Sequence, residues 1–410
     1  MGPRPGGGGA RATRVTGPAP LPLLPYGRQT IEDDDVAAVA AALRSDFLTT
    51  GPLVETFEAA FAETVGARHA VACANGTAAL HLAMLALRVQ PGEAVIAPSI
   101  TFLATANCAR YVGAEVVFAD VDPDSGLMTP DTLAEAVQRM GERRLRAVLP
   151  VHLRGDVADL PGLAALAGAA GAVLVEDAPH ALGTTMTFGN VAERVGDARH
   201  SAMATFSFHP VKTIATGEGG MVTTNDPGLA ERLRVMRSHG MVRPQTSSGP
   251  GADPWWYEMA EPGFNYRLPD ILCALGLSQL AKLDRFAARR RALVESYRTA
   301  LAPLSPLVRI AARASWSDPV LHLMGVLIDF DAAGVTRRQV VDGLRARGVG
   351  SQVHYIPVHR QPYYRDRYGP LNLPGAERWY ARCLSLPLYP GLADEDVARV
   401  VEALSAVLGL

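Results

Sequence analysis

A single lysine lies in a segment that is unusual for this residue type. Residues 207–221 have the sequence SFHPVKTIATGEGGM, so Lys212 stands between an apolar run and a glycine-rich turn. A surface lysine in a loop is the alternative interpretation of this position. A lysine held away from water instead loses its proton readily and becomes a nucleophile that forms a Schiff base with a carbonyl carbon. Lys212 is therefore a candidate catalytic residue.

An aspartate follows a second apolar run. In AVLVEDAPHALG, residues 172–183, Asp177 comes after four apolar residues and Glu176. A carboxylate in such a position costs free energy unless a cation compensates for the lost water. A helix cap or a turn is the alternative role for this aspartate. As part of a chemical site, Asp177 requires a positively charged partner.

The third candidate is a strand-to-helix junction with the sequence CANGTAAL, residues 73–80. Gly76 and Thr77 open the predicted helix, where free N–H groups and the helix dipole bind anions, and Thr77 adds a hydroxyl. Many ordinary junctions of this kind contain glycine, and the segment lacks the Lys-Ser/Thr pair of a Walker loop. The junction on its own therefore indicates no more than an anion site.

Together, the three candidates require one ligand that has a phosphate, a basic ring nitrogen and an aldehyde. Pyridoxal 5′-phosphate (PLP) carries all three groups. In this arrangement the phosphate lies at the helix N-terminus, Asp177 keeps the ring nitrogen protonated, and Lys212 binds the aldehyde. The sequence thus predicts PLP as the cofactor.

The elements that must position these residues alternate along the chain. Short apolar runs predict strands at 69–74, 93–99, 114–121, 144–151, 172–177, 203–208 and 219–226. Helices separate the early strands, which is typical of a mostly parallel sheet with helices on both faces. Ligands of such sheets bind beyond the carboxyl ends of the strands, where all three candidates fall. A long helix from Asp270 is expected to link this α/β domain, residues 26–297, to a smaller C-terminal α/β domain, residues 298–410.

Composition and charge exclude several other classes of protein. The chain has 410 residues and a net charge of −2, which gives no case for nucleic acid or an anionic membrane. Four cysteines without metal-ligand spacing predict no metal site and favour a reducing cytoplasm. Residues 1–25 are rich in Gly, Pro and Arg without the apolar core of a signal peptide, so we expect a disordered leader. No stretch reaches the roughly 18 apolar residues of a membrane span.

With these motifs in order, the sequence resembles the DegT/DnrJ/EryC1/StrS sugar aminotransferases, a family of fold-type I PLP enzymes. The resemblance covers residues 26–408 and includes NGTAALHLA, VEDAPHALG, SFHPVKTIATGEGG, GFNYRLPDI and CLSLPLYPGL. It implies that Lys212 forms the Schiff base and then moves protons, while Asp177 pairs with the pyridinium nitrogen. The other cofactor contacts that it implies are Gly76, Thr77 and Ser207 at the phosphate, Phe102 and His180 at the ring, and Asn265, which reaches the phosphate in a partner subunit.

The resemblance also implies partners and substrate contacts. Enzymes of the family are homodimers whose active sites lie at the interface, and they take the amino group from L-glutamate. Arg267 is implied to hold the anionic cosubstrate or the nucleotide. The implied contacts of the nucleotide keto-sugar are Thr49, His354 and Tyr355. The roles of three further features stay open: His209, His359 and the segment Trp255–Tyr257.

Within the family, SFHPVKTIATGEGG, GFNYRLPDI and HYIPVHRQPYY most resemble the transaminases of pseudaminic acid synthesis. These enzymes transfer an amino group to C4 of a UDP-4-keto-6-deoxy-N-acetylhexosamine. Arg154 and Asp156 in PVHLRGDVADL depart from the commoner PVHLYGQPADM, and this change in a pocket wall puts the sugar in question. Transfer to C3 or C4 of a different dTDP-, GDP- or UDP-linked keto-sugar is therefore the alternative.

Three other functions are disfavoured by the same residues. The sugar dehydratases of the family have histidine in place of the Schiff-base lysine, whereas this chain has Lys212. A non-catalytic regulatory protein on this fold usually lacks the lysine or the acid, and both are present here. The sugar-family motifs argue against an ordinary amino-acid aminotransferase.

Overall fold

The computed structural model describes residues 2, 22–243, 253 and 255–410. Most of the predicted leader, residues 1–25, lies outside the described residues. The end of that segment is described: Leu24 is buried in the C-terminal core and pairs with Val349 through an isolated parallel bridge. Its N–H also donates to the carbonyl of Gly348 at 2.9 Å. Leu24, inside the predicted leader, thus packs into an apolar core, and the boundary at residue 25 stays a prediction.

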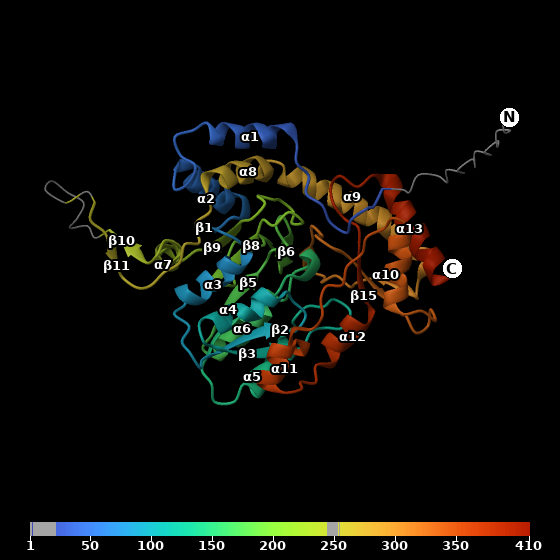
Figure 1. Ribbon diagram of the computed structural model, residues 1–410. Helices are drawn as coiled ribbons and strands as arrows, with labels where there is room; N and C mark the ends of the chain where they lie inside the picture. Colours follow the sequence, from blue (N-terminus) through green and yellow to red (C-terminus); the bar gives the residue numbers. More distant parts are fainter. Residues whose placement is uncertain (1, 3–21, 244–252, 254) are drawn as a thin grey trace.

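A seven-stranded sheet lies at the centre of the larger part of the molecule (Figure 1). Its order is β1-β9-β8-β5-β4-β2-β3, and of these seven strands only β9 runs antiparallel to its neighbours. The strands are β1 (His69–Cys73), β2 (Ala94–Pro98), β3 (Glu115–Ala119), β4 (Leu145–Val148), β5 (Val173–Asp177), β8 (Met203–Ser207) and β9 (Gly220–Thr224). The predicted mostly parallel sheet is confirmed.

Helices cover both faces of this sheet, and each face has its own apolar core. One face carries α3 (Gly76–Ala86), α4 (Leu103–Tyr111) and α7 (Pro227–Arg237). The other carries α2 (Pro52–Val65), α5 (Pro130–Arg139), α6 (Leu160–Ala169) and α8 (Asp270–Leu280). Successive strand side chains point to opposite faces, so Val71 joins the first core while Ala70 and Ala72 join the second. Because both faces are covered, the strands are nearly continuous apolar runs.

A smaller three-stranded antiparallel sheet belongs to the C-terminal part of the chain. Its order is β12 (Val308–Ile310), β14 (Met324–Ile328) and β15 (Cys383–Leu386), and it shares a core with α9 (Leu283–Leu301), α10 (Arg337–Ala346) and α13 (Asp394–Leu408). The remaining elements are η1 (Leu153–Gly155), β6 (Thr185–Phe188), β7 (Val191–Arg194), β10 (Met241–Val242), β11 (Glu258–Met259), η3 (Ala302–Leu304), β13 (Ser317–Asp318), η4 (Val358–Arg360), α11 (Pro362–Tyr368) and α12 (Pro374–Arg382). The division of the chain at residue 297 stays a prediction, and α9 runs across it.

The long helix predicted from Asp270 is interrupted. It forms two helices, α8 and α9, which are separated at Ala281 and Lys282. The Lys282 ammonium is drawn to the N-terminal turn of α1 (Asp33–Leu43), where it lies 2.6 Å from Asp34 Oδ1 and 2.7 Å from Asp35 Oδ1. Pattern and propensity could not predict this break, because the acids that accompany it lie far away in the sequence.

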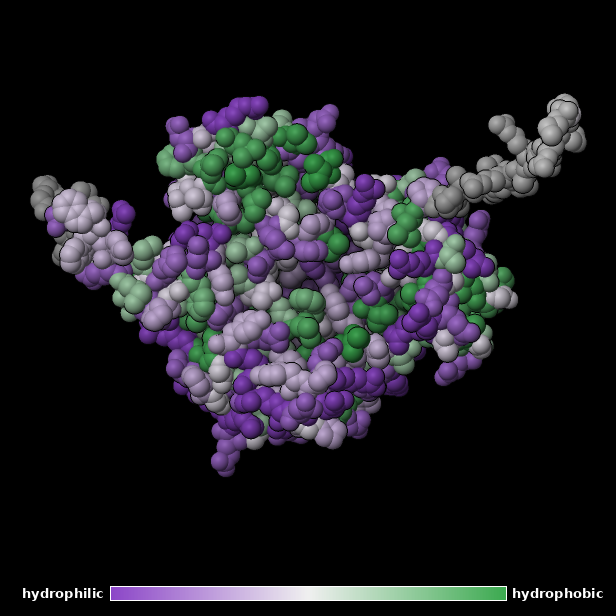
Figure 2. All heavy atoms as spheres, viewed as in Figure 1, coloured by the Kyte–Doolittle hydropathy of each residue, from purple (hydrophilic) through white to green (hydrophobic). Residues whose placement is uncertain are grey.

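The surface over α1 carries an apolar patch. Figure 2 shows hydrophobic side chains gathered at the top of the molecule, over α1 and the start of α2. The exposed apolar residues of this region are Ile31, Val36, Leu43, Phe47 and Leu48. None of the helices within the described ranges is both long and apolar enough to cross a bilayer.

Candidate active site

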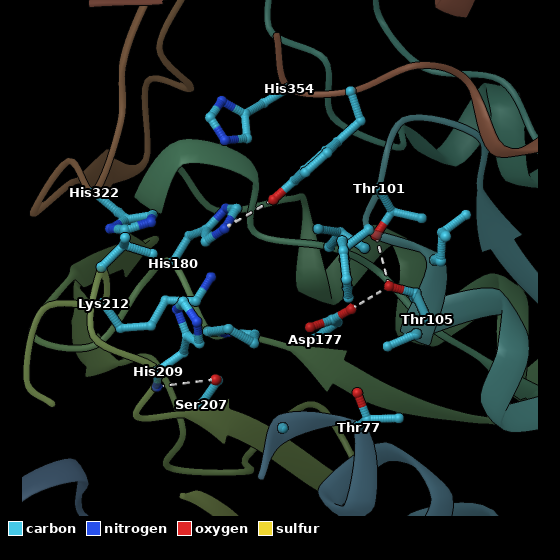
Figure 3. Close-up of a pocket in the computed structure, with 18 of the residues that line it drawn as sticks. Thr77, Thr101, Thr105, Asp177, His180, Ser207, His209, Lys212, His322 and His354 are labelled. Atoms are coloured by element: carbon cyan, nitrogen blue, oxygen red, sulfur yellow. Dashed lines mark hydrogen bonds between the residues drawn. The ribbon is translucent and has the colours of Figure 1, made fainter. Parts of the chain in front are cut away.

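A cavity of about 680 Å³ opens at the carboxyl ends of β1, β5 and β8. Figure 3 shows the polar side chains that converge on it. The predicted site residues that line this cavity are Gly76, Thr77, Phe102, Asp177, His180, Ser207, Lys212, His354 and Tyr355. The strand ends that the sequence indicated separately therefore meet at one place.

One end of the cavity is built from the first turn of α3. Asn75 caps this helix, because its side-chain oxygen accepts a hydrogen bond from the Ala78 N–H at 2.8 Å. The N–H groups of a first helical turn have no partner within the helix, so those of Gly76 and Thr77 are available to an anion. A Cβ at Gly76 would lie 2.8 Å from Ser207 Cβ, which shows how closely β8 approaches the helix end. Only glycine permits this approach without a shift.

Another part of the cavity wall holds a buried carboxylate. Asp177 is the last residue of β5, and Thr105 Oγ1 donates to its Oδ2 at 2.5 Å. Thr101 Oγ1 lies 2.6 Å from Thr105 Oγ1 and extends this hydrogen-bond chain. Burial raises the pKa of Asp177, although the Thr105 bond and the Lys212 charge oppose the rise. No ion pair of Asp177 occurs among the described residues, so the carboxylate is suited to a cation in the cavity.

Thr101 and Thr105 are not among the site residues that the sequence motifs predict. Thr101 and Thr105 are one helical turn apart in an expected helix that adjoins a strand end, and both are buried. Two threonines with this spacing, at the start of a helix near the edge of the sheet where the ligand is predicted, were the signal from which these residues could have been predicted. Without the tertiary contact, nothing in the segment linked Thr105 to Asp177.

Lys212 lies in the turn that follows β8. Its backbone N–H donates to the carbonyl of His209 at 2.8 Å, which closes the turn, and its side chain enters the cavity (Figure 3). Burial lowers the pKa of Lys212 to about 8, and the Asp177 charge limits the fall. About a tenth of the amine is therefore neutral at pH 7, far more than for an ordinary lysine, and this neutral form is the nucleophile.

Two histidines on the cavity wall are fixed by hydrogen bonds. Nδ1 of His180 accepts from the Arg154 backbone N–H at 3.3 Å, so the proton of the neutral ring lies on Nε2, which is 3.3 Å from the Tyr355 hydroxyl. Nδ1 of His354 lies 2.8 Å from Ser385 Oγ. Burial lowers the pKa of His180 well below its ordinary value and that of His354 to about 3. Both rings are thus neutral at physiological pH.

Three predicted site residues lie outside the cavity of the single chain. They are Thr49, which is exposed before α2, and Asn265 and Arg267, which follow the β10–β11 segment. Of the features left open, His209 lines the cavity, whereas His359 lies outside it and contacts Ser99 and Glu377. Trp255, Trp256 and Tyr257 are all exposed, so packing of these three side chains into the core of the chain is excluded.

The residues of the cavity fit PLP. A main-chain anion site beside Ser207, a buried carboxylate without an ion-pair partner and a lysine with a lowered pKa line a single cavity. These three groups match the phosphate, the pyridine nitrogen and the aldehyde of the cofactor. The fold and this site define the class of PLP-dependent aminotransferases with fold type I.

Comparison with known proteins identifies the family within this class. The model of the DegT/DnrJ/EryC1/StrS aminotransferase family matches residues 29–405, and the chain belongs to this family. It is thus a PLP-dependent nucleotide-sugar aminotransferase, as the sequence motifs predict.

Individual relatives cover nearly the whole chain. The spore coat polysaccharide biosynthesis protein SpsC of Bacillus subtilis (strain 168) is 38% identical over 94% of this chain and 97% of its own length. Helicobacter pylori PseC, an aminotransferase of pseudaminic acid biosynthesis, is 28% identical with a TM-score of 0.84, over 94% of this chain and 99% of that one. DesI, solved in the presence of its TDP-sugar product, is 34% identical with a TM-score of 0.82. The match covers 94% of this chain and 93% of that one.

Proposed function

We propose that this protein transfers the amino group of L-glutamate to C4 of a UDP-linked 4-keto-6-deoxy-N-acetylhexosamine, a step of pseudaminic acid synthesis. The observation that carries the amino transfer is the meeting of Lys212, Asp177 and the α3 N-terminus in one cavity. The motifs shared with the pseudaminic acid transaminases and the structural similarity to PseC support the sugar.

The chain's own residues account for cofactor binding. Bound PLP supplies a carbon that carries the amino group and a protonated ring that accepts electrons from the substrate. Gly76, Thr77 and Ser207 hold the phosphate through N–H and hydroxyl donors. Asp177 keeps a proton on the ring nitrogen, and Thr105 keeps this carboxylate oriented. Phe102, with 58% of its surface exposed at the cavity edge, is free to cover the ring.

Lys212 holds the aldehyde end and moves protons at the reacting carbon. Its pKa of about 8 lets Nζ take a proton from Cα of glutamate and return one to the sugar carbon. Because glutamate would give its amino group to the cofactor and the keto-sugar would take it from there, with Lys212 moving the proton in both half-reactions, the two substrates occupy the cavity in turn. The reaction therefore follows a ping-pong order.

The sugar end of the site extends to the C-terminal part of the chain. Tyr355 and His354 reach the cavity from the segment after α10, and Tyr26 lies against His354 with ring centroids 5.4 Å apart. We assign the sugar contacts to this wall. Arg267 and Thr49 lie outside the cavity, so their predicted contacts require a second copy of the chain.

A homodimer completes this proposal. The apolar patch over α1 is suited to a second copy, because burying such a surface in an interface is favourable. Asn265 is exposed in the single chain, as a residue that reaches the partner's phosphate site must be.

The four cysteines, all buried free thiols, support the predicted cytoplasmic location.

A TDP-linked keto-sugar is the second candidate substrate. DesI was solved with its TDP-sugar product and is more similar in sequence to this chain than PseC is, at 34% against 28%. The buried residues Arg154 and Asp156 also depart from the common family pattern. They do not line the cavity, but the Arg154 N–H donates to Nδ1 of His180 on its wall. The test therefore compares the UDP-linked and the TDP-linked keto-sugar as acceptors of the amino group.

The test begins with the visible absorbance of the purified protein. We expect a PLP band that L-glutamate converts to the shorter-wavelength pyridoxamine form, and that the UDP-4-keto-6-deoxy-N-acetylhexosamine restores. Recovery with a TDP-keto sugar alone would favour the second candidate. The variant Lys212→Ala is the control and should bind PLP without turnover. A wild-type rate in this variant, or a protein with no band after incubation with PLP, would refute the proposal.

A further inference from the structure

His322, which sequence analysis did not single out, lines the cavity close to Lys212. It follows β13, and Figure 3 shows it with His180 on the Lys212 side of the site, away from Thr77. Its ring centroid lies 4.6 Å from that of His180. The phosphate and ring-nitrogen contacts lie elsewhere on the wall, so His322 faces the region of the reacting carbon.

The imidazole of His322 has an unused hydrogen-bonding capacity. Its Nδ1 is buried without a hydrogen-bond partner among the described residues, and no bond of its Nε2 occurs there either. By contrast, His180 and His354 both have partners. A proton on the fully buried Nδ1 would be a donor that no acceptor could reach, whereas Nε2 is not among the fully buried atoms without a partner, so we assign the proton of the neutral ring to Nε2.

Burial and nearby cations favour the neutral form of His322. Burial lowers its pKa well below the ordinary value, and the positive charges of Lys212 and Arg290 act in the same direction. Protonation of the neighbouring His180 or His354 would lower it further. Arg290 is also buried and donates to the His322 carbonyl at 3.3 Å. The ring therefore favours its uncharged form, in which one of the two nitrogens carries a proton.

The backbone of His322 is held from two sides. Its N–H donates to the Arg154 carbonyl at 2.7 Å, while the Arg154 N–H donates to His180 Nδ1. Arg290 binds the carbonyls of Leu321 and His322 from α9. The imidazole is thus presented to the cavity by a fixed segment rather than by a free loop.

The two substrates place opposite demands on this region. L-Glutamate brings a carboxylate next to the reacting carbon, whereas a sugar ring brings uncharged hydroxyls to the same place. No arginine of the same chain lines the cavity within the described residues, and Arg267 is proposed to reach the site only from a second copy. A buried guanidinium would be left without a counter-charge whenever the sugar is bound, which is costly. A neutral donor meets both substrates without that cost.

We propose that His322 is a substrate-contacting residue whose Nε2–H donates to the α-carboxylate of glutamate in one half-reaction and to a sugar hydroxyl in the other. This inference rests on the proposed amino transfer. It assigns one uncharged donor to both half-reactions.

The test compares three variants at this position. In His322→Gln the side-chain amide nitrogen takes the position of imidazole Nε2, whereas in His322→Asn it takes the position of Nδ1. In His322→Phe the ring shape is kept but the donor is lost. We expect His322→Phe and His322→Asn to weaken glutamate binding roughly 10- to 100-fold and sugar binding roughly 2- to 10-fold, because bonds to charged acceptors are stronger. His322→Gln should recover most of both affinities.

The rate of each half-reaction is followed separately by absorbance at increasing concentrations of glutamate or of the keto-sugar. The dissociation constant of each substrate is taken from this concentration dependence. Calorimetry with glutarate, a dicarboxylate that cannot react, gives a measure independent of turnover. His81→Phe is the matched control, because His81 is equally buried but outside the cavity, and it should change neither affinity more than about twofold. Retention of the PLP band verifies that each variant is folded.

The pH dependence separates a neutral donor from a charged one. We expect the ratio of glutamate dissociation constants, His322→Phe over wild type, to be constant between pH 6.5 and 8.5. A ratio that falls about tenfold per pH unit would overturn the neutral assignment. Equal affinities in all three variants, or loss of glutamate affinity in His322→Gln equal to that in His322→Phe, would overturn the contact itself. A wild-type protein that glutamate leaves unchanged would instead refute the proposed function.

Discussion

The substitution Gly76→Ala tests the anion site at the start of α3. A Cβ at this position would lie 2.8 Å from Ser207 Cβ, 3.2 Å from Ser207 Oγ and 3.5 Å from Ser207 Cα. Ordinary van der Waals contact begins near 3.4 Å, so the helix end and β8 must separate by roughly 0.6 Å, the difference between 3.4 and 2.8 Å. The separation moves the two elements that carry the phosphate donors.

The cost of such overpacking is about 1–3 kcal/mol. Without cofactor the chain relieves part of this strain by shifting, but phosphate binding requires the original spacing. We therefore expect the affinity for PLP to fall roughly 5- to 150-fold. Titration of the cofactor-free protein with PLP, followed by absorbance, measures this loss.

Gly168→Ala is the matched control for this experiment. Gly168 lies in α6, and a Cβ there would meet nothing within 4 Å. This variant should bind PLP as the wild type does and gain about 0.5–1 kcal/mol of stability, because alanine is the better helix former. If Gly76→Ala and Gly168→Ala had the same PLP affinity, the close approach of β8 to α3 would not control the phosphate site.

Three further predictions concern the acid and the lysine. The rate of PLP uptake should rise about tenfold per pH unit below pH 8 and level off above it, because the neutral Lys212 amine reacts; an uptake rate independent of pH would contradict this. In Asp177→Asn the midpoint should move to lower pH, since the Asp177 charge raises the Lys212 pKa; a midpoint at higher pH would refute that coupling. Thr105→Val removes the 2.5 Å bond to Asp177 and should lower the free energy of unfolding by about 1–3 kcal/mol in denaturant titrations, against little change for the exposed Thr56→Val.

The sheet could be predicted because its strands are local apolar runs. Each β-strand after a helix appears as a short hydrophobic segment such as AVLVED, whatever the rest of the chain does. The break between α8 and α9 could not be predicted in this way. It coincides with ion pairs between Lys282 and acids of α1, which lie nearly 250 residues away in the sequence.

The residues of the candidate site likewise fall into those that a local sequence pattern predicts and those that only the fold reveals. Lys212, Asp177 and Gly76 each follow a recognisable strand, and parallel topology brings strand ends to one edge. Thr105 and His322 carry no comparable local signal, because their importance comes from contacts with Asp177 and His180 across the fold. Side chains that matter through distant neighbours cannot be identified from the segment in which they lie.

The sequence by itself determined the sheet, the cofactor and the family, because these depend on residue types at fixed positions along short segments. Only the tertiary structure decided the electrostatics of the cavity. The lowered pKa of Lys212 and the neutral histidines come from burial, and burial is set by packing between segments that are far apart in the chain. Desolvation is a property of the folded surroundings, so no local pattern contains it.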